Sequence, residues 1–339
     1  MRLLITGGAG FIGSNFVRYM IRKYPHYQIS NLDLLTYAGN HEGLEELGNH
    51  PHYHFVKGNI CDRELVDALV SGKSAGASNK GTVPVDVMVN LAAETHVDRS
   101  IAEPECFIRT NVLGTQVLLE AARKYQVKKY VQISTDEVYG SLGETGHFTE
   151  ESPLAPNNPY SSSKAGADLL VRAYYKTYGL PVNITRCSNN YGPYQFPEKF
   201  IPLMISNALQ DKELPIYGDG RNIRDWLHVD DHCSAIDLVI HQGKPGEIYN
   251  IGGSNEQMNR DVAKKILTIL KKPENLLRFV QDRPGHDRRY AINPNKISTE
   301  LGWKPKRTFD DGLEETIKWY KNNRNWWIEQ KKSLCKKQE

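Results

Sequence analysis

Tyr160 and Lys164 form a pair whose types and spacing could support acid–base chemistry. They are four residues apart, so on a helix both side chains project from the same face. An ammonium group close to a phenol stabilises the phenolate and lowers the phenol pKa from about 10 toward neutral pH. The pair therefore predicts a tyrosine that acts as a general base with the help of a lysine.

A second group with chemical potential is Ser134-Thr135-Asp136-Glu137, which follows a short apolar run predicted to be a strand. Neighbouring carboxyl groups resist ionising together, so one of them stays protonated to a higher pH than an isolated acid. We expect Asp136 and Glu137 to titrate as a coupled pair, although a random Asp-Glu pair would more often lie in a solvated turn.

A glycine-rich segment near the N-terminus could hold a dinucleotide. Gly7, Gly10 and Gly13 lie between an apolar run and an amphipathic stretch, which is where a helix N-terminus can bind a pyrophosphate. Asp33 follows about 20 residues later, at the end of the second apolar run, and could accept hydrogen bonds from both ribose hydroxyls. Because this carboxylate would repel a 2′-phosphate, the pattern favours NAD over NADP.

Apolar runs and amphipathic stretches alternate through the first half of the chain. The pattern indicates a doubly wound parallel sheet, an α/β fold of the Rossmann type, with ligands bound at the carboxyl ends of its strands. The predicted strands are Arg2–Thr6, Gln28–Leu32, His54–Val56, Val85–Leu91, Tyr130–Ser134 and Val182–Arg186. The predicted helices are Phe11–Lys23, Asp62–Ser71, Cys106–Tyr125 and Tyr160–Tyr178.

The pattern becomes irregular after this half, which predicts two interleaved lobes. We expect residues 1–188 to form the NAD-binding domain and residues 189–330 to form mainly a smaller, C-terminal substrate-binding lobe. The segment Tyr249–Ile251 should return to the main sheet. Residues 71–84 are predicted to be a surface insertion, and the Lys-rich end after Trp327, with residues 331–339, a frayed tail.

Several motifs together carry a family resemblance that covers nearly the whole chain. They are NLDLLTYAGN (31–40), LAAETHVDRS (91–100), STDEVYG (134–140), SNNYGP (188–193), IRDW (223–226) and DRPGHDR (282–288). In these motifs the chain resembles the extended short-chain dehydrogenases/reductases, and within them the nucleotide-sugar 4,6-dehydratases. The resemblance implies a hydro-lyase of deoxysugar and rhamnose supply that uses NAD, with dTDP-glucose as substrate and a 4-keto-6-deoxy sugar as product.

The implied mechanism is oxidation at C4, loss of water across C5–C6 and return of the hydride to C6. The resemblance implies that Tyr160 takes the proton of the C4 hydroxyl and that Lys164 holds the nicotinamide ribose. It also implies that Thr135 hydrogen-bonds the reacting oxygen. A ketone at C4 would acidify the C5 hydrogen, so Glu137 could remove it while Asp136 protonates the departing C6 hydroxyl.

The resemblance also implies two sets of binding residues. The cofactor set is Gly7, Gly10, Phe11, Ile12, Gly13, Asp33, Leu34, Leu35, Thr36, Asn59, Ile60, Leu91, Ala92, Ala93, Thr95, Thr110, Tyr160, Lys164 and Asn190. The substrate set is Thr95, Thr135, Asn189, Glu198, Lys199, Phe200, Pro215, Tyr217, Arg224, Asn259, Arg283 and His286. Asn59 replaces a more usual Asp near the adenine, so NAD affinity is the property most open to change.

Other functions remain alternatives. A nucleotide-sugar 4-epimerase would share Tyr160, Lys164 and the glycine segment, but it has no need of an acid and a base beside Thr135. A UDP-glucuronate decarboxylase would look alike over the whole chain. A redox sensor that binds a dinucleotide without catalysis would usually lack an intact tyrosine–lysine pair.

The composition narrows the possible partners. A net charge of +3, from 43 basic and 40 acidic residues, does not favour nucleic acid or a membrane surface as partner. Five scattered cysteines, together with an N-terminus that shows no leader pattern, predict reduced thiols and a cytoplasmic protein. His228 and His232 have H-x-x-x-H spacing but no obvious third ligand, so no metal is expected. We expect a homodimer through the helices Cys106–Tyr125 and Tyr160–Tyr178.

Overall fold

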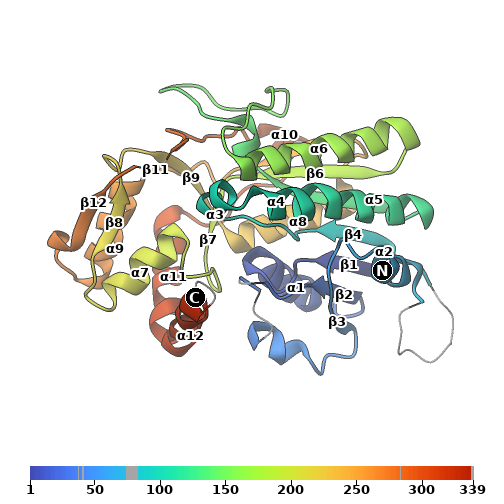
Figure 1. Cartoon of the computed structure of the whole chain (residues 1–339), viewed down its shortest axis with the longest axis horizontal. Coiled ribbons are helices and arrows are strands. Elements are labelled where there is room, and N and C mark those ends of the chain that lie inside the picture. The colour runs from blue at the N-terminus through green and yellow to red at the C-terminus, as the bar shows by residue number, and fades with distance from the viewer. Residues whose placement is uncertain (37, 40–41, 74–82, 283, 337–339) are drawn as a thin grey trace.

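A seven-stranded sheet forms the larger lobe of the protein (Figure 1). The computed structural model describes the whole chain except residues 37, 40–41, 74–82, 283 and 337–339. The strand order is β10-β6-β5-β4-β1-β2-β3, and every neighbouring pair is parallel. The strands are β1 (Arg2–Thr6), β2 (Gln28–Asp33), β3 (Tyr53–Lys57), β4 (Val87–Asn90), β5 (Lys129–Thr135), β6 (Val182–Cys187) and β10 (Ile248–Ile251).

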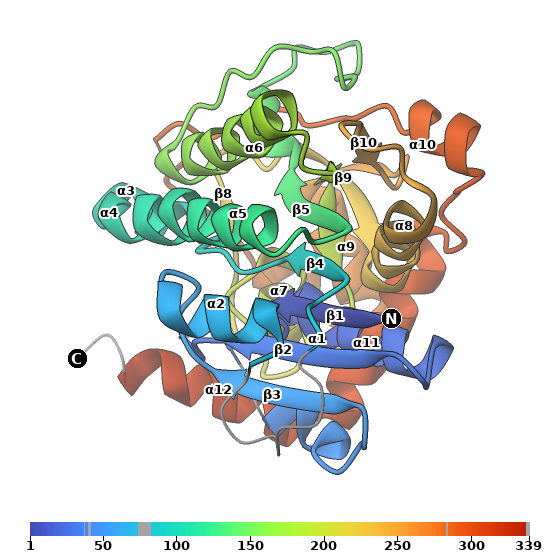
Figure 2. The same cartoon turned by 90° about the vertical axis from the view of Figure 1, so that its right-hand side faces the viewer.

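Helices cover both faces of this sheet, as the doubly wound prediction requires (Figure 2). Side chains of α1 and α8 form one apolar core with the sheet, and side chains of α2, α5 and α6 form the other. Because both faces are covered, central strands such as β4 and β6 are buried along their whole length. The helices are α1 (Phe11–Lys23), α2 (Arg63–Ser71), α5 (Thr115–Lys124), α6 (Pro159–Tyr178), α8 (Val229–Gln242) and α10 (Asn295–Leu301).

The helix predicted at Cys106–Tyr125 is divided into three segments. It comprises α4 (Pro104–Phe107), a π-helix, η2 (Ile108–Gly114), and α5. Within η2, the Asn111 amide donates to Glu94 O at 3.0 Å and to Ser163 Oγ at 2.8 Å, and it accepts from Glu94 N at 2.9 Å. The local pattern of apolar residues carries no information on these contacts to two distant segments. The sequence therefore predicted one continuous helix here and not a π-helix.

The smaller lobe contains two short sheets and the last helices of the chain. Strands β7 and β11 flank β9 in a three-stranded sheet, and β8 pairs with β12. Its strands are β7 (Asn189–Tyr191), β8 (Leu214–Tyr217), β9 (Ile223–His228), β11 (Glu256–Met258) and β12 (Leu277–Val280). Its helices are α7 (Phe200–Ala208), α9 (Asn259–Leu270), η4 (Glu274–Leu276), α11 (Phe309–Asn322) and α12 (Arg324–Lys336). The remaining short helices of the chain are η1 (Glu42–Leu47), α3 (Val97–Ala102) and η3 (Asp136–Tyr139).

The prediction of a frayed tail after Trp327 is wrong for residues up to 336, because α12 continues to Lys336. Trp327 is fully buried, and its Nε1 donates to Tyr320 O at 2.9 Å. Lys331 Nζ also donates to Asn207 Oδ1 at 2.9 Å. A buried tryptophan thus anchors a sequence that looks solvated from its composition.

Two further points concern the predicted surface insertion and the possibility of a membrane-spanning helix. Most of the predicted insertion at 71–84 lies outside the described residues. Among the residues that the structure does describe, no helix is both long and apolar enough to cross a membrane.

Candidate active site

A cavity of about 310 Å³ opens at the carboxyl ends of β1, β2, β4, β5 and β6. Twenty-four of the residues predicted for the site line it, although they come from segments spread over almost 200 positions. They are Gly7, Gly10, Phe11, Ile12, Gly13, Asp33, Leu34, Thr36, Asn59, Ile60, Leu91, Ala92, Ala93, Thr95, Thr110, Thr135, Asp136, Glu137, Tyr160, Lys164, Asn189, Asn190, Glu198 and Lys199.

The glycine segment turns tightly from β1 into α1. Gly7 has φ +71°, and a Cβ at this position would lie 2.5 Å from Ala92 N. A Cβ at Gly13 would lie 2.1 Å from Gly7 O, so a side chain at either position would displace backbone. Helix α1 then begins with Gly10 as its N-cap and with no acidic side chain in its first turn. This helix terminus can therefore receive an anion.

Asp33 is held at the end of β2 by backbone amides. Its Oδ2 accepts from Ala9 N at 2.9 Å, and its Oδ1 accepts from Leu35 N at 2.8 Å. Burial raises the pKa of the Asp33 carboxyl, while these two hydrogen bonds lower it. Asp33 thus joins the glycine segment to the following turn. Leu35, which was predicted to contact the cofactor, supplies this amide and does not line the cavity.

Asp136 and Glu137 follow β5 but have different surroundings. Asp136 is 1% exposed, whereas Glu137 is half-buried. Burial, and then the Glu137 charge, raise the pKa of Asp136 well above its ordinary range. The Thr135 hydroxyl donates to Asp136 Oδ1 at 3.3 Å and accepts from Glu137 N at 3.2 Å. Asp136 is therefore suited to remain a protonated acid next to a second carboxyl group.

Tyr160 and Lys164 lie on the first turns of α6, and both line the cavity. The direction of the Tyr160 pKa differs from the prediction: burial and the Glu137 charge raise it, and a hydrogen bond to Thr135 lowers it only in part. Lys164 Nζ donates to Ile133 O at 2.6 Å. The i to i+4 spacing on the helix thus brings both side chains to one cavity, as predicted. Burial, however, raises the Tyr160 pKa by more than the nearby ammonium was expected to lower it.

The arrangement matches known proteins over almost the whole chain. A model of the family described as GDP-mannose 4,6 dehydratase matches residues 4–316. The chain belongs to this family.

Proteins similar to this chain agree with it in length as well as in sequence. The chain is 51% identical over 331 residues to a dTDP-glucose 4,6-dehydratase of Streptomyces niveus, covering 96% of this chain and 95% of the relative. A crystal structure of dTDP-glucose 4,6-dehydratase from Bacillus anthracis in complex with NAD is 56% identical, with a TM-score of 0.89 and coverage of 97% and 99%. A UDP-glucose 4-epimerase from Thermotoga maritima is 29% identical, with a TM-score of 0.86 and coverage of 96% and 100%.

The cavity of this family member fits NAD by its own geometry. The side-chain-free space at Gly7 and Gly13 lets the backbone approach a pyrophosphate at α1. Asp33 lies at the cavity wall where a ribose with two free hydroxyls could be bound. Asn59, the residue that departs from the usual Asp, turns its Oδ1 back to accept from Cys61 N at 2.9 Å.

Several residues that line the cavity were not predicted. Glu94 and Ser134 lie inside the motifs at 91–100 and 134–140, so their position in those motifs was a usable signal. Cys187, Gln195 and Phe196 have no such signal, because they reach the cavity only through the path of the chain after β6. At the Glu94 side of the cavity, Lys199 Nζ donates to Thr95 O at 3.1 Å.

Six of the residues predicted for substrate binding lie in the smaller lobe and do not line this cavity; Arg283 lies outside the described residues. The six are Phe200, Pro215, Tyr217, Arg224, Asn259 and His286. Arg224 is nevertheless close enough for its charge to lower the pKa of Asp136. Its guanidinium donates to Ile223 O at 2.8 Å and to Asp287 O at 3.0 Å, and it lies over the Tyr290 ring.

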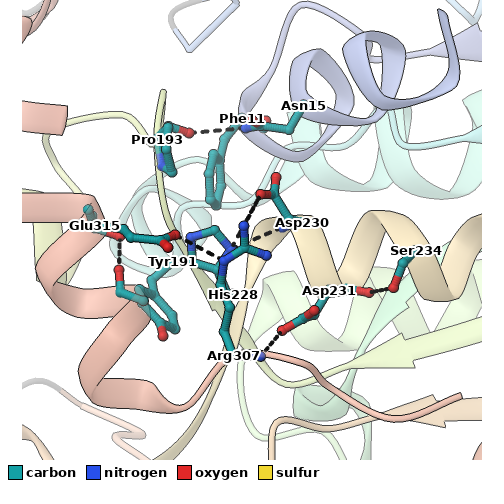
Figure 3. Close-up of polar contacts among 12 residues, drawn as sticks. Phe11, Asn15, Tyr191, Pro193, His228, Asp230, Asp231, Ser234, Arg307 and Glu315 are labelled. Carbon is teal, nitrogen blue, oxygen red and sulfur yellow. Dashed lines mark hydrogen bonds and ion pairs between the residues drawn. The ribbon is translucent and has the colours of Figure 1, made fainter. Parts of the chain in front are cut away.

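The loop after β7, which carries Gln195 and Phe196 to the cavity, is fastened to other elements. Asn15 Nδ2 on α1 donates to Pro193 O at 3.0 Å (Figure 3). Tyr320 on α11 donates its hydroxyl to Gln195 O. Gln195 Nε2 donates to Asn190 O at 2.9 Å. These contacts fix one wall of the cavity to helices from both ends of the chain.

His228 and His232 lie near this loop, and in the described part of the chain they do not belong to a group of three possible metal ligands. Burial, and then the nearby Arg307 charge, lower the pKa of His228 to about 4. Figure 3 shows Arg307 between α8 and α11, where it pairs with Asp230 at 2.8 Å and with Glu315 at 3.0 Å. His228 is therefore a buried neutral side chain beside an ion-pair cluster.

Proposed function

We propose that this chain is an NAD-dependent dTDP-glucose 4,6-dehydratase, a hydro-lyase acting on a nucleotide-linked sugar. The observation that carries the proposal is the buried Asp136 carboxyl beside Glu137, in one cavity with Tyr160 and a dinucleotide-type glycine segment. Relatives of about 50% identity that carry this name over nearly the full length support the choice of sugar and nucleotide.

NAD bound in the cavity would accept a hydride from the sugar and give it back, so that no external oxidant is consumed. The chain's own groups handle the protons. Tyr160 takes the proton of the C4 hydroxyl, and Lys164 orients the nicotinamide ribose. Thr135 hydrogen-bonds the oxygen at C4 as it becomes a ketone. Burial raises the pKa of the Tyr160 phenol, so the phenol must first lose its proton to solvent before it can take the proton of the C4 hydroxyl.

The two carboxyl groups carry out the elimination. The C4 ketone acidifies the C5 hydrogen, and Glu137 removes it. Asp136, protonated because of its burial, gives its proton to the C6 hydroxyl, which leaves as water. After the hydride reaches C6, Glu137 returns a proton to C5. Glu137 thereby ends as it began, whereas Tyr160 has gained a proton and Asp136 has lost one. A proton must pass from Tyr160 to Asp136 through solvent before the next cycle.

An acid–base pair of this kind separates the proposal from its rivals. A 4-epimerase of the same fold, such as the Thermotoga maritima protein, has no water to expel. A UDP-glucuronate decarboxylase expels carbon dioxide and needs no acid for a C6 hydroxyl. A non-catalytic redox sensor would not need Tyr160, Lys164 and both carboxyl groups in one cavity.

The test is to incubate the protein separately with dTDP-glucose, UDP-glucose and UDP-glucuronate, and to measure the product masses and, by NMR, the configuration at C4. A product lighter by one water from dTDP-glucose is expected, and Tyr160→Phe should abolish it. A product of unchanged mass with inverted C4, or one that has lost carbon dioxide, would instead identify an epimerase or a decarboxylase.

Domain roles and assembly extend the proposal. Residues 1–188 bind NAD, and residues 189–330 mainly select the sugar nucleotide. The chain forms a homodimer through η2, α5 and α6, which lie in the two helices expected to form the interface. Exposed apolar side chains on η2 and α6 support this choice: Ile108, Leu113 and Leu169. The four described cysteines are free thiols, which suits a cytoplasmic location.

A further inference from the structure

A buried network of charged and polar side chains lies next to Lys164, and its members have no part in the chemistry above. Asp168 follows Lys164 by one turn of α6 and is 1% exposed. Its Oδ2 accepts from Arg186 Nε on β6 at 2.9 Å. Arg186 Nη1 donates to the Tyr139 hydroxyl at 2.9 Å, and this hydroxyl donates to Asn250 Oδ1 at 2.8 Å. The network joins α6 to β6, η3 and β10.

Lys164 needs a counter-charge to stay an ammonium group in this position. It is 4% exposed, and burial lowers its pKa because a desolvated cation is costly. Its hydrogen bond to Ile133 O supplies a dipole but no negative charge. The carboxylate of Asp168 has the largest opposing effect and raises the Lys164 pKa.

Asp168 in turn depends on Arg186. Burial raises the pKa of the Asp168 carboxyl, which favours the neutral acid, whereas Arg186 lowers it through its charge and its hydrogen bond. The Arg186 side chain is 4% exposed and that of Asp168 is 1% exposed, so solvent screens this ion pair weakly. The guanidinium is thus a fixed support for the aspartate charge.

Other titratable groups face the network from several elements. Tyr139 on η3 contacts Arg186, and Cys187 on β6 acts on Lys164. Asp136 and Glu137, both near Tyr160, raise the pKa of that phenol. Asp168 differs from all of these groups because it combines a negative charge with a position on the same helix face as Lys164.

We propose that Asp168 is a positioning residue for the reaction: its carboxylate, kept ionised by Arg186, holds Lys164 as a cation in the cavity wall beside Tyr160. The inference rests on the proposed function, because it acts through the role given to Lys164. The inference extends the Tyr160–Lys164 pair by a third residue on α6, Asp168, which is itself paired with Arg186 on β6.

The test uses Asp168→Asn, which keeps the side-chain shape and removes the charge. Lys164 should become neutral at lower pH, so the fall of kcat on the basic side of the pH profile moves down by at least about one unit, a tenfold loss of kcat there. KM for dTDP-glucose should change less than about threefold. Asp168→Glu, which keeps the carboxylate, should restore most of the profile.

A second readout does not require turnover. Competitive acetylation of the full chain without substrate, followed by mass spectrometry, measures the fraction of Lys164 present as free amine. At about pH 7 this fraction should rise about tenfold in Asp168→Asn. The matched control is Asp237→Asn, which removes another buried carboxylate, paired with Lys23 at 2.6 Å, and should leave Lys164 acetylation unchanged.

Unchanged Lys164 acetylation and an unshifted pH profile in Asp168→Asn would overturn the proposal. If that variant does not fold, the wild-type titration decides, since a Lys164 that is already mostly neutral at about pH 7 would also overturn it. Failure of the proposed function is distinguishable: the wild-type protein would not convert dTDP-glucose, while the acetylation difference would persist.

Discussion

His232 Nδ1 on α8 lies 2.9 Å from Asn190 Oδ1 on β7. Asn190 Nδ2 donates to Ser188 O at 2.9 Å, so its Oδ1 faces the imidazole and Nδ1 is the donor. His232 is fully buried, and burial lowers its pKa to about 3. A neutral histidine therefore orients an amide that lines the cavity.

Stability should consequently fall in mild acid. The folded His232 takes up a proton only near pH 3, whereas the unfolded chain does so near pH 6.5. Between these values the unfolded state binds more protons, so the free energy of unfolding decreases as the pH is lowered. Per histidine, the loss from neutral pH to about pH 5 is about 2 kcal/mol.

Urea denaturation at the two pH values checks this. In His232→Asn the loss of unfolding free energy between them should be smaller by about that amount. His26→Asn, at an exposed position, is the control and should keep the wild-type loss. An unchanged loss in His232→Asn would show that this imidazole is not the group that titrates.

Variants of the two carboxyl groups should slow different steps of the reaction. Glu137→Gln should lower kcat by about 10² to 10⁴-fold and abolish exchange of the C5 hydrogen with deuterated water. Asp136→Asn should retain that exchange but lose water from C6 slowly, since an amide cannot give up its proton. Product mass and NMR of the sugar measure both effects. Normal turnover by Glu137→Gln, or loss of exchange in the Asp136 variant alone, would reverse the assignment.

Asp33→Asn should weaken NAD binding by about tenfold, about 1.4 kcal/mol, because it removes a charged acceptor and points an amide donor at Ala9 N or Leu35 N. Calorimetric titration should also show that the affinities for NAD and NADP differ less in this variant than in the wild-type protein. Asp62→Asn is a suitable control, since Asn remains a good N-cap for α2 and the position does not line the cavity. Equal NAD affinity in Asp33→Asn and wild type would exclude the ribose contact.

Leu169→Glu should convert the proposed dimer into a monomer. Leu169 is 56% exposed on α6, and a carboxylate there would have to be desolvated in the interface. Sedimentation velocity measures the change. Phe279→Glu, at a 55% exposed apolar position on β12 of the smaller lobe, should leave the dimer intact. A wild-type protein that sediments as a monomer would contradict the assembly proposal itself.

Local sequence determined the chemistry that this protein can carry. A glycine spacing after a strand, an aspartate at the end of the next strand and a tyrosine four residues before a lysine are short-range patterns. Each of them constrains a backbone turn or a helix face, so Gly7, Asp33, Tyr160 and Lys164 could be found without coordinates. The alternation of strands and helices likewise predicted the parallel sheet.

Tertiary structure decided what surrounds these groups. Burial, which depends on residues far apart in the chain, raises the Tyr160 pKa where the spacing to Lys164 alone predicted a decrease. Contacts across the fold also bring Arg186 to Asp168 and bury Trp327 in a segment that looked solvated. Desolvation and long-range pairing depend on three-dimensional packing, and a linear pattern of residue types does not contain that information.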